Sequence, residues 1–187
     1  MNKAFLSGVA AVAALGISTA SAVELDGKKG IGAATAIGGT SGLAFNYGTG
    51  NLAIEGILSV DNFVPGKDAD GVNTINLGVG AHFMALRADK AAFSVGGRLN
   101  LGMGKTKPDD NEKPPAKAED VTQFGLDIPL RVYWFADEHV SFHYETGISV
   151  AMAGDKGGFL PTKAVGAESR DINIFGIQSG VGATFWW

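Results

Sequence analysis

Bulky apolar residues alternate with small or polar residues along most of this chain, and this period of two constrains the fold more than any other feature. The pattern is clearest over residues 139–153. The bulky positions there are Val140, Phe142, Tyr144, Thr146, Ile148, Val150 and Met152. Successive side chains of a β-strand point to opposite faces, whereas a helix repeats about every 3.6 residues. The segment is therefore predicted to be a strand with one bulky face and one small or polar face.

The same alternation recurs along the chain and predicts eight strands. They are expected at about residues 29–37, 41–48, 51–61, 73–86, 91–104, 121–135, 139–153 and 171–187. Tight links near 48–51, 87–90 and 136–138 alternate with longer polar links at about 62–71, 105–120 and 154–170, and the link at 38–40 is unusually short. An even strand number with short turns at one end and long loops at the other is typical of membrane barrels. The predicted fold is an all-β, eight-stranded antiparallel up-and-down transmembrane β-barrel.

The first 22 residues have the features of a secretory signal peptide. Lys3 precedes an apolar run over residues 4–17, and the segment ends in Ala20-Ser21-Ala22, a small-x-small processing site. The run is shorter than the roughly 20 apolar residues that a membrane-spanning helix needs. We therefore predict a signal peptide over residues 1–22, which is removed, and one barrel domain over residues 23–187 that is exported to the bacterial outer membrane.

Alternation alone also fits a soluble lipocalin-like barrel, whose apolar face points inward. A water-facing exterior needs many charged residues, yet only 18% of this chain is charged, and its small face carries mostly glycine, alanine, serine and asparagine. Glycine accounts for 28 of the 187 residues, which suits the narrow lumen of an eight-stranded barrel. The bulky face is therefore expected to contact lipid, and the small face to line the lumen.

Aromatic residues gather toward the short-turn end of the predicted barrel, as in the interfacial girdle of membrane barrels. The expected girdle comprises Tyr47, Tyr133, Trp134, Phe142, Tyr144, Phe185 and Trp187. With this architecture and its last seven residues, 181–187, the mature chain resembles the small eight-stranded outer-membrane barrels, the group that contains the OmpA transmembrane domain and OmpX.

The resemblance implies that the barrel-assembly machinery reads the final strand, by an aromatic last residue preceded by apolar residues at alternate positions. The matching residues are Val181, Ala183, Phe185 and Trp187, with tryptophan in place of the more frequent terminal phenylalanine. We also expect both termini to face the periplasm and the barrel to lie in outer-membrane lipid and lipopolysaccharide. Four links then extend outward, and the long loops are available to an extracellular or envelope partner.

Charged residues on the predicted lumen face form the candidate site. They are Glu55, Asp61, Arg98, Asp127, Arg131 and Glu145, with His82 and His143 beside them. Ionised groups in a narrow lumen must be paired or hydrated. One interpretation is an ion-pair network that plugs and rigidifies the barrel; another makes the same residues the gate of a narrow channel for water, ions or small solutes. The width of an eight-stranded barrel favours the plug.

A third interpretation is a lipid-modifying enzyme. His139, Ser141, His143 and Glu145 place imidazoles, a hydroxyl and a carboxylate on one strand face, and nucleophilic catalysis uses these groups. His139-Val140-Ser141 is similar to the His-x-Ser arrangement of outer-membrane lipid A deacylases, which are also small barrels. That site faces lipid, whereas His139 and Ser141 fall on the predicted lumen face, so we expect no enzymatic activity.

Composition argues against several other functions. The chain has no cysteine, which excludes disulfides, thiolate zinc sites and a lipoprotein anchor. With 15 basic and 19 acidic residues, it lacks the cationic surface that a nucleic-acid partner needs. The histidines are too few for a metal site, and Asp61, Asp68 and Asp70 lack calcium-loop spacing. The sequence therefore predicts a barrel with a structural or surface-interaction role and with no cofactor.

Overall fold

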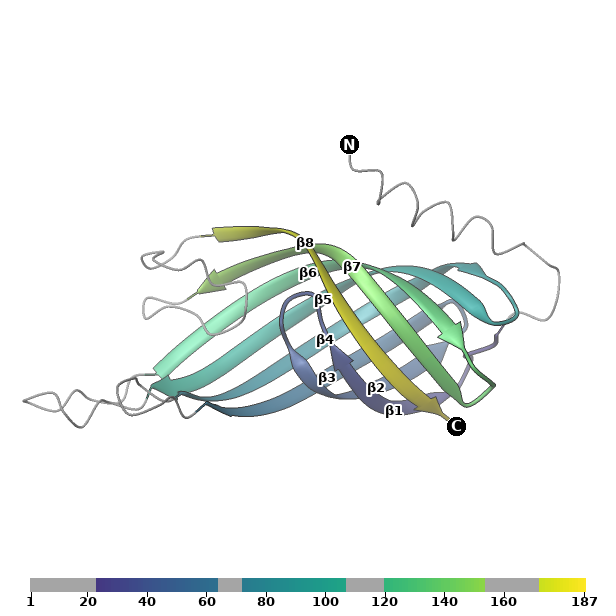
Figure 1. Cartoon of the computed structure of the whole chain (residues 1–187), viewed down its shortest axis with the longest axis horizontal. Coiled ribbons are helices and arrows are strands. Elements are labelled where there is room, and N and C mark those ends of the chain that lie inside the picture. The colour runs from purple at the N-terminus through teal and green to yellow at the C-terminus, as the bar shows by residue number, and fades with distance from the viewer. Residues whose placement is uncertain (1–22, 64–71, 107–119, 154–171) are drawn as a thin grey trace, which may run out of the picture.

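The computed structural model describes residues 23–63, 72–106, 120–153 and 172–187. Within these ranges the chain forms eight strands, coloured from purple to yellow in Figure 1. They are β1 (Lys29–Thr35), β2 (Ser41–Thr49), β3 (Leu52–Phe63), β4 (Val72–Arg87), β5 (Ala91–Thr106), β6 (Asp120–Phe135), β7 (Val140–Ala153) and β8 (Ile172–Trp186). Each bound lies within two residues of its prediction. The described ranges contain no helix long and apolar enough to cross a membrane.

Each strand pairs antiparallel with the next, and β8 pairs with β1, so the sheet closes into a barrel. Short turns join β2 to β3, β4 to β5 and β6 to β7 at the end where the C-terminus lies (Figure 1). We call this the short-turn end and the opposite one the loop end. The predicted up-and-down barrel is confirmed, and a closed sheet is one of the two structures that satisfy backbone hydrogen bonds inside a bilayer.

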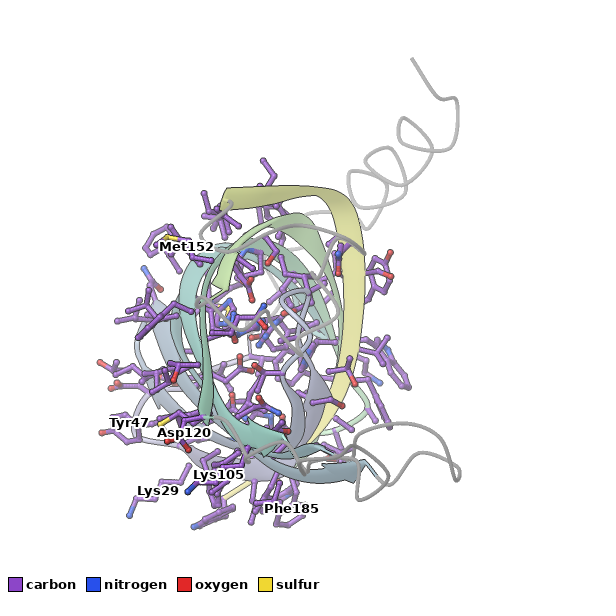
Figure 2. All side chains as sticks on the ribbon, turned by 90° about the vertical axis from the view of Figure 1, so that its left-hand side faces the viewer. Lys29, Tyr47, Lys105, Asp120, Met152 and Phe185 are labelled. Atoms are coloured by element: carbon purple, nitrogen blue, oxygen red, sulfur yellow. The ribbon has the colours of Figure 1, made fainter. Side chains whose placement is uncertain are left out.

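The outer face of the barrel is apolar and its inner face polar, the reverse of a water-soluble protein. On the outer face, Leu99 is 66% exposed and Phe124 is 58% exposed. On the inner face, Arg98 is 1% exposed. Figure 2 shows Tyr47 and Met152 pointing away from the barrel. An apolar surface of this extent is stable only against hydrocarbon. The prediction that the bulky face contacts lipid is therefore confirmed.

The outward apolar residues form a belt of membrane height. On β6 the belt runs from Phe124 to Trp134. With a rise of about 3.3 Å per residue and a tilt of about 40°, this stretch covers roughly 25 Å along the barrel axis. The lipid-facing band of membrane barrels has the same height. The fold is therefore a transmembrane β-barrel.

Aromatic side chains gather on the outer face at the short-turn end, as predicted, with one exception. The rings of Trp134 and Phe142 stack with centroids 5.6 Å apart, and those of Phe185 and Trp187 stack at 6.3 Å. Tyr133, also expected in the girdle, is 2% exposed and lies inside the barrel. Alternation explains the difference, because Tyr133 precedes the outward Trp134 and so points to the lumen.

Glycines on the lumen face stand beside the largest lumen side chains. Gly80 is the cross-strand neighbour of both Glu55 and Arg98, and Gly182 is that of His143. A Cβ atom at Gly182 would lie 2.3 Å from Cε1 of His143. The high glycine content thus leaves room for a few bulky polar residues in a lumen that eight strands make narrow.

Gly180 allows a direct test of whether glycine makes room for the lumen side chains. A Cβ there would lie 2.1 Å from the carbonyl oxygen of Thr35 and 3.0 Å from Cγ of Glu145. We expect Gly180→Ala to lower the free energy of unfolding by about 1–3 kcal/mol, the usual effect of overpacking. Gly97→Ala is the matched control, since a Cβ at Gly97 meets nothing within 4 Å. Urea unfolding of both variants, refolded in lipid vesicles and followed by tryptophan fluorescence, measures the difference, and equal stabilities would contradict the packing argument.

Candidate functional site

The predicted lumen charges come together in one buried cluster, which we call the lumen network. Glu55 on β3, Arg98 on β5, Arg131 on β6 and Glu145 on β7 are each 1% exposed or less. Strand register creates two of the contacts directly, because Arg131 faces Glu145 and Arg98 faces Asp127 across neighbouring strands. Opposite charges at cross-strand positions stabilise a sheet. The structure therefore brings these sequence-predicted residues together in the lumen.

Arg98 contacts all three carboxylates of the network. Its Nε and Nη2 atoms donate to Glu55 Oε1 at 3.1 and 2.9 Å. Its Nη1 and Nη2 atoms donate to the two oxygens of Glu145 at 2.9 and 2.8 Å, which makes a bidentate pair. Nη1 also donates to Asp127 Oδ2 at 3.2 Å. The guanidinium group of Arg98 is therefore saturated with acceptors.

Arg131 binds the same two glutamates through its own guanidinium group. Nη1 and Nη2 donate to the two oxygens of Glu55 at 2.9 and 3.0 Å, while Nε and Nη2 donate to Glu145 Oε2 at 3.0 and 2.6 Å. Nη1 also donates to the hydroxyl oxygen of Tyr133 at 2.9 Å. Two guanidinium groups bridged by two carboxylates satisfy one another, which is the condition under which buried ions are tolerated.

The third carboxylate, Asp127, is held by neutral donors as well as by Arg98. Asn100 Nδ2 donates to Asp127 Oδ2 at 2.8 Å, and the backbone N–H of Gly38 donates to the same oxygen at 3.2 Å. Among the described residues, the network therefore balances three carboxylates with two guanidinium groups and with amide dipoles.

The link between β1 and β2 completes the network from inside the barrel. Ile37 and Gly38 of this link are buried, and the backbone N–H of Ile37 donates to Glu145 Oε1 at 2.9 Å. Thr40 is also fully buried and donates from Oγ1 to Asn100 Oδ1 at 3.0 Å. The link therefore lies inside the lumen. Its backbone N–H groups and the Thr40 hydroxyl donate to side chains of the lumen network.

The prediction that four links extend outward is wrong for the β1–β2 link. Gly39 has a φ of +88°, a conformation that favours glycine and reverses the chain here. A Cβ at Gly38 would lie 2.4 Å from Asp127 Oδ1, so only glycine fits against the carboxylate. A link that is short, uncharged and rich in glycine is the sequence signal that predicts this inward course.

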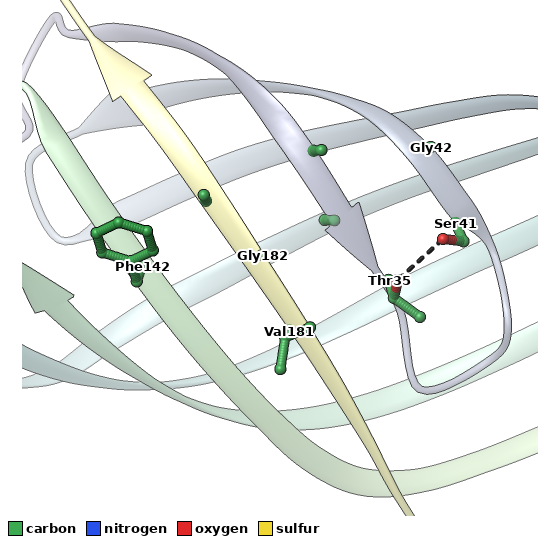
Figure 3. Close-up of a pocket in the computed structure, with 9 residues that line it drawn as sticks. Thr35, Ser41, Gly42, Phe142, Val181 and Gly182 are labelled. Atoms are coloured by element: carbon green, nitrogen blue, oxygen red, sulfur yellow. Dashed lines mark hydrogen bonds between the residues drawn. The ribbon is translucent and has the colours of Figure 1, made fainter.

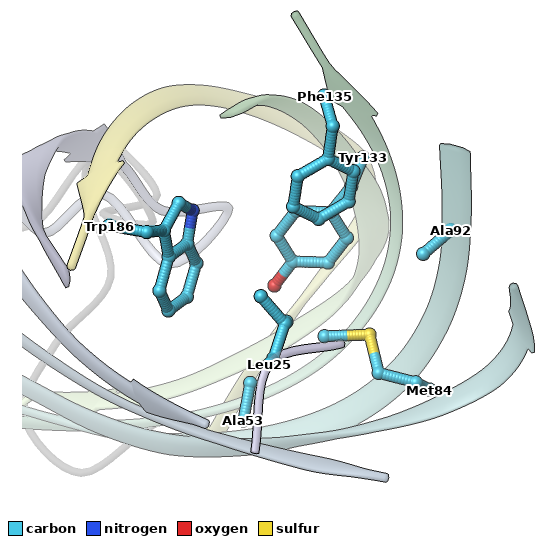
Figure 4. Packing of buried hydrophobic residues seen from close by; sticks show 7 residues of the cluster. All are labelled: Leu25, Ala53, Met84, Ala92, Tyr133, Phe135 and Trp186. Atoms are coloured by element: carbon cyan, nitrogen blue, oxygen red, sulfur yellow. The ribbon is translucent and has the colours of Figure 1, made fainter. Parts of the chain in front are cut away.

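A second cluster, of apolar residues, occupies the lumen at the short-turn end (Figure 4). We call it the apolar plug; its members are Leu25, Ala53, Met84, Ala92, Tyr133, Phe135 and Trp186. Trp186 is 1% exposed, and its Nε1 donates to Ser141 Oγ at 2.8 Å. The hydroxyl of Tyr133 accepts from Arg131, so the plug and the lumen network are joined directly.

Sequence reasoning missed the apolar plug because it considered only outward aromatic residues. Trp186 stands between the outward Phe185 and Trp187, so its inward direction follows from the same period of two. Leu25 precedes the first strand, where periodicity gives no signal.

The structure places His82 and His143 in the lumen. His82 is fully buried, with Nε2 3.5 Å from Glu55 Oε1. His143 is 5% exposed, and its ring centroid lies 5.6 Å from that of Tyr133. The side chain of Asp61 lies outside the described residues. Across the described part of the chain, no three histidine or acidic side chains are grouped in a way that suits a metal ion.

His139 and Ser141 do not come together as a catalytic pair. The side chain of His139 is 50% exposed, and its ring stacks on the outward Phe185 with centroids 5.9 Å apart. Ser141 is fully buried inside the barrel and accepts the hydrogen bond from Trp186. The predicted lumen position of His139 is therefore wrong, whereas that of Ser141 is correct.

The cause lies in the turn between β6 and β7, because β7 begins only after His139. Asp137 Oδ1 accepts hydrogen bonds from the backbone N–H groups of His139 and Val140, both at 2.8 Å. These two donors lower the pKa of the Asp137 carboxyl. The turn therefore controls the direction of His139, and strand alternation applies only from Val140 onward.

Comparisons with known proteins identify no family for this chain. No protein-family model matches the sequence, and no curated protein matches it. Among solved structures, Ail, the attachment invasion locus protein of Yersinia pestis, is similar with a TM-score of 0.45 and 11% identity over 87% of this chain and 99% of that chain. The barrel architecture described above rests on this chain's own strand pairing.

Removing one cation of the lumen network should be strongly destabilising. Arg131→Met leaves Glu55 and Glu145 to share Arg98, and breaking a buried ion pair lowers the free energy of unfolding by about 3–5 kcal/mol. Lys105→Met is the control, because the Lys105–Asp120 ion pair is exposed and such pairs contribute at most about 1 kcal/mol. Urea unfolding in vesicles compares the two variants. Similar losses for both would show that the network contributes no more than a surface pair.

The two C-terminal tryptophans allow a matched test of the apolar plug. Trp186 is buried and Trp187 is 57% exposed on the outer face. We expect Trp186→Ala to lower the free energy of unfolding by about 3–5 kcal/mol, as for a large core side chain, and Trp187→Ala to lower it by less. The same unfolding assay decides, and the reverse order would contradict the assignment of Trp186 to the lumen.

Proposed function

We propose that this protein is an outer-membrane barrel of a diderm bacterium with a structural or surface-interaction role and a lumen that does not conduct. The apolar belt supports anchoring in the membrane, and the lumen network and apolar plug support a closed interior. The segments 64–71, 107–119 and 154–171 lie outside the described residues; we propose that they present a surface to an extracellular or envelope partner.

The observation that carries the closed lumen is the succession of two filled layers. Four strands and the β1–β2 link contribute hydrogen-bonded atoms to the lumen network. A solute passing this layer has to break charge-assisted hydrogen bonds, and it then meets the apolar plug. Hydrophobic constrictions of this kind stop ions by excluding water.

A narrow channel for water, ions or small solutes is the alternative function. Toward the loop end from the network, the lumen is lined by neutral polar side chains of the kind that hydrate a pore. They include Thr74, Asn76, Asn100 and Gln123. In this alternative, Arg98 or Arg131 moves aside to open a path. A lipid-modifying activity has less support, because Ser141 is buried and hydrogen-bonded to Trp186.

We further propose that both termini face the periplasm and that the barrel-assembly machinery reads β8 during insertion. Val181, Phe185 and Trp187 are exposed on the outer face, and Ala183 is half-buried there. Their exposure supports this proposal, because a partner protein is able to contact side chains on the outer face.

Planar-bilayer recording tests the closed lumen. For the refolded mature protein and for Trp187→Ala, the outer-face control, we expect no discrete current steps. The double variant Arg131→Ala/Trp186→Ala, which removes one member of each layer, is expected to give steps. Heat-dependent gel mobility verifies that each sample is folded. Discrete steps from the folded wild type that change in Arg131→Ala would overturn the proposal in favour of the channel.

A further inference from the structure

One oxygen of the Asp127 carboxylate has no hydrogen-bond partner among the described residues. Its Oδ2 atom accepts three hydrogen bonds, from Arg98, from Asn100 and from the backbone N–H of Gly38, at 2.8 to 3.2 Å. The Oδ1 atom accepts none of them, although the side chain is fully buried. A buried acceptor without a donor is unfavourable, and more so when it carries charge. This oxygen therefore favours a ligand that is not part of the described chain.

The hydroxyl of Ser149 is in the same situation and lies directly opposite Asp127. The two residues are cross-strand partners on the lumen face of β6 and β7. Ser149 is also fully buried, and its Oγ atom has no hydrogen-bond partner among the described residues, Asp127 included. Opposed side chains have Cβ atoms about 5 Å apart, so both oxygens border the same part of the lumen. One anionic and one neutral oxygen together suit a hard cation.

The charges of the lumen network point to a cation at this position. Within the described residues, the carboxylates of Glu55, Asp127 and Glu145 face the guanidinium groups of Arg98 and Arg131, which leaves one negative charge when the histidines are neutral. Both arginines bind both glutamates. Asp127 receives only Nη1 of Arg98, at 3.2 Å, the longest of the hydrogen bonds that this arginine donates to the network. The excess negative charge is therefore concentrated at Asp127.

The lumen beside the two oxygens has room on its loop-end side. The next lumen pair in the register is Gly125 opposite Ala151, and both are small. A Cβ atom at Gly125 would lie 3.5 Å from its nearest neighbour, Cβ of Asn100, which is an ordinary contact; a Cβ at Gly182 would lie 2.3 Å from its nearest neighbour. The next lumen residue of β6 is the neutral, polar Gln123. A hydrated cation therefore meets small and polar side chains on this side.

The β1–β2 link covers Asp127 from inside the barrel. The hydroxyl oxygens of Thr35 and Ser41, 2.9 Å apart and hydrogen-bonded, join the two ends of this link (Figure 3). Gly38 of the link lies so close to the carboxylate that a Cβ there would be 2.4 Å from Oδ1. Its N–H nevertheless donates to Oδ2. The link thus shields the Oδ1 atom without giving it a donor.

We propose that Asp127 and Ser149 bind one monovalent metal cation, Na⁺ or K⁺, with water molecules completing its coordination shell. One positive charge neutralises the excess charge of the lumen network. A divalent ion would reverse that charge, and Ca²⁺ requires six to eight oxygen ligands. The cation lies on the loop-end side of the network, because Asp127 precedes Arg131 on β6, which runs from the loop end to the short-turn end.

Urea unfolding in different salts tests the site. The inference concerns lumen charge and not conduction, so the bilayer recordings neither support nor contradict it. The refolded mature protein is studied in vesicles of phosphatidylcholine, which has no net charge, with NaCl, KCl or choline chloride at equal concentration. A ligand that binds only the folded state stabilises it. We expect a higher urea midpoint in NaCl or KCl than in choline chloride, because choline is too large for the site.

Asp127→Asn removes the excess charge while keeping the shape of the side chain. Its amide oxygen is able to accept the hydrogen bonds that Oδ2 accepts in the wild type, and its NH₂ group takes the place of the cation, where it is able to donate to Ser149. We therefore expect the urea midpoint of this variant to be the same in all three salts. A response to Na⁺ or K⁺ as large as that of the wild type would overturn the proposal, because it indicates a general salt effect.

A pair of serine variants gives an independent test, which decides alone if Asp127→Asn does not fold. Ser149→Ala removes one ligand of the cation. Ser94→Ala is the matched control, because Ser94 is also fully buried and its hydroxyl also lacks a described partner, but it lies opposite Arg131. From the dependence of the urea midpoint on cation concentration, we expect at least tenfold weaker binding in Ser149→Ala and wild-type binding in Ser94→Ala. Equal binding in the two variants would contradict the assignment.

Sodium NMR relaxation measures occupancy without unfolding the protein. Bound Na⁺ relaxes faster than free Na⁺, so we expect excess relaxation with the wild type and with Ser94→Ala, and at least a tenfold smaller excess with Asp127→Asn. Heat-dependent gel mobility again verifies folding. Equal wild-type midpoints in the three salts would overturn the proposal. A midpoint that then depends on pH would assign the balancing charge to a proton, and one that does not would leave water as the partner of both oxygens.

Discussion

Two guanidinium groups and three carboxylates buried inside a narrow barrel are the constraint on which the rest of this structure depends. Such charges are tolerated only when nearly every donor and acceptor is paired. Cross-strand register provides the Arg131–Glu145 and Arg98–Asp127 pairs, and a shift of one residue would turn these side chains into lipid. The charged interior therefore fixes the register of the sheet as firmly as the apolar exterior does.

Space for these side chains comes from the glycines. In a barrel of eight strands the lumen holds little more than its own side chains, so each arginine or histidine needs a small neighbour. Gly80 beside Arg98, and Gly182 beside His143, meet that need. The same narrowness lets one apolar layer of seven residues occupy the short-turn end. The high glycine content, the close ion pairing and the filled lumen thus all follow from the small width of an eight-stranded barrel.

Periodicity was enough to predict the barrel and the strand bounds to within two residues, and it placed Glu55, Arg98, Asp127, Arg131 and Glu145 on the face that lies inside the barrel. It failed where the backbone leaves the strand conformation. His139 precedes the start of β7 and turns outward, and the β1–β2 link turns inward at Gly39. Tyr133 was expected on the outer face because it is aromatic. Its position on β6, one residue before the outward Trp134, directs it into the lumen instead. Contacts between specific atoms, such as Trp186 with Ser141, depend on the barrel's closure and have no signature in one sequence.

The short β1–β2 hairpin connects the interior of the barrel with its lipid surface. Because β1 ends at Thr35, residues 36–40 are able to enter the lumen and bring the N–H groups of Ile37 and Gly38 to Glu145 and Asp127. A longer hairpin would complete the wall between β3 and β8, but it would carry these donors away from the network. The shortness of this hairpin is therefore what allows the backbone of the chain to satisfy the buried carboxylates.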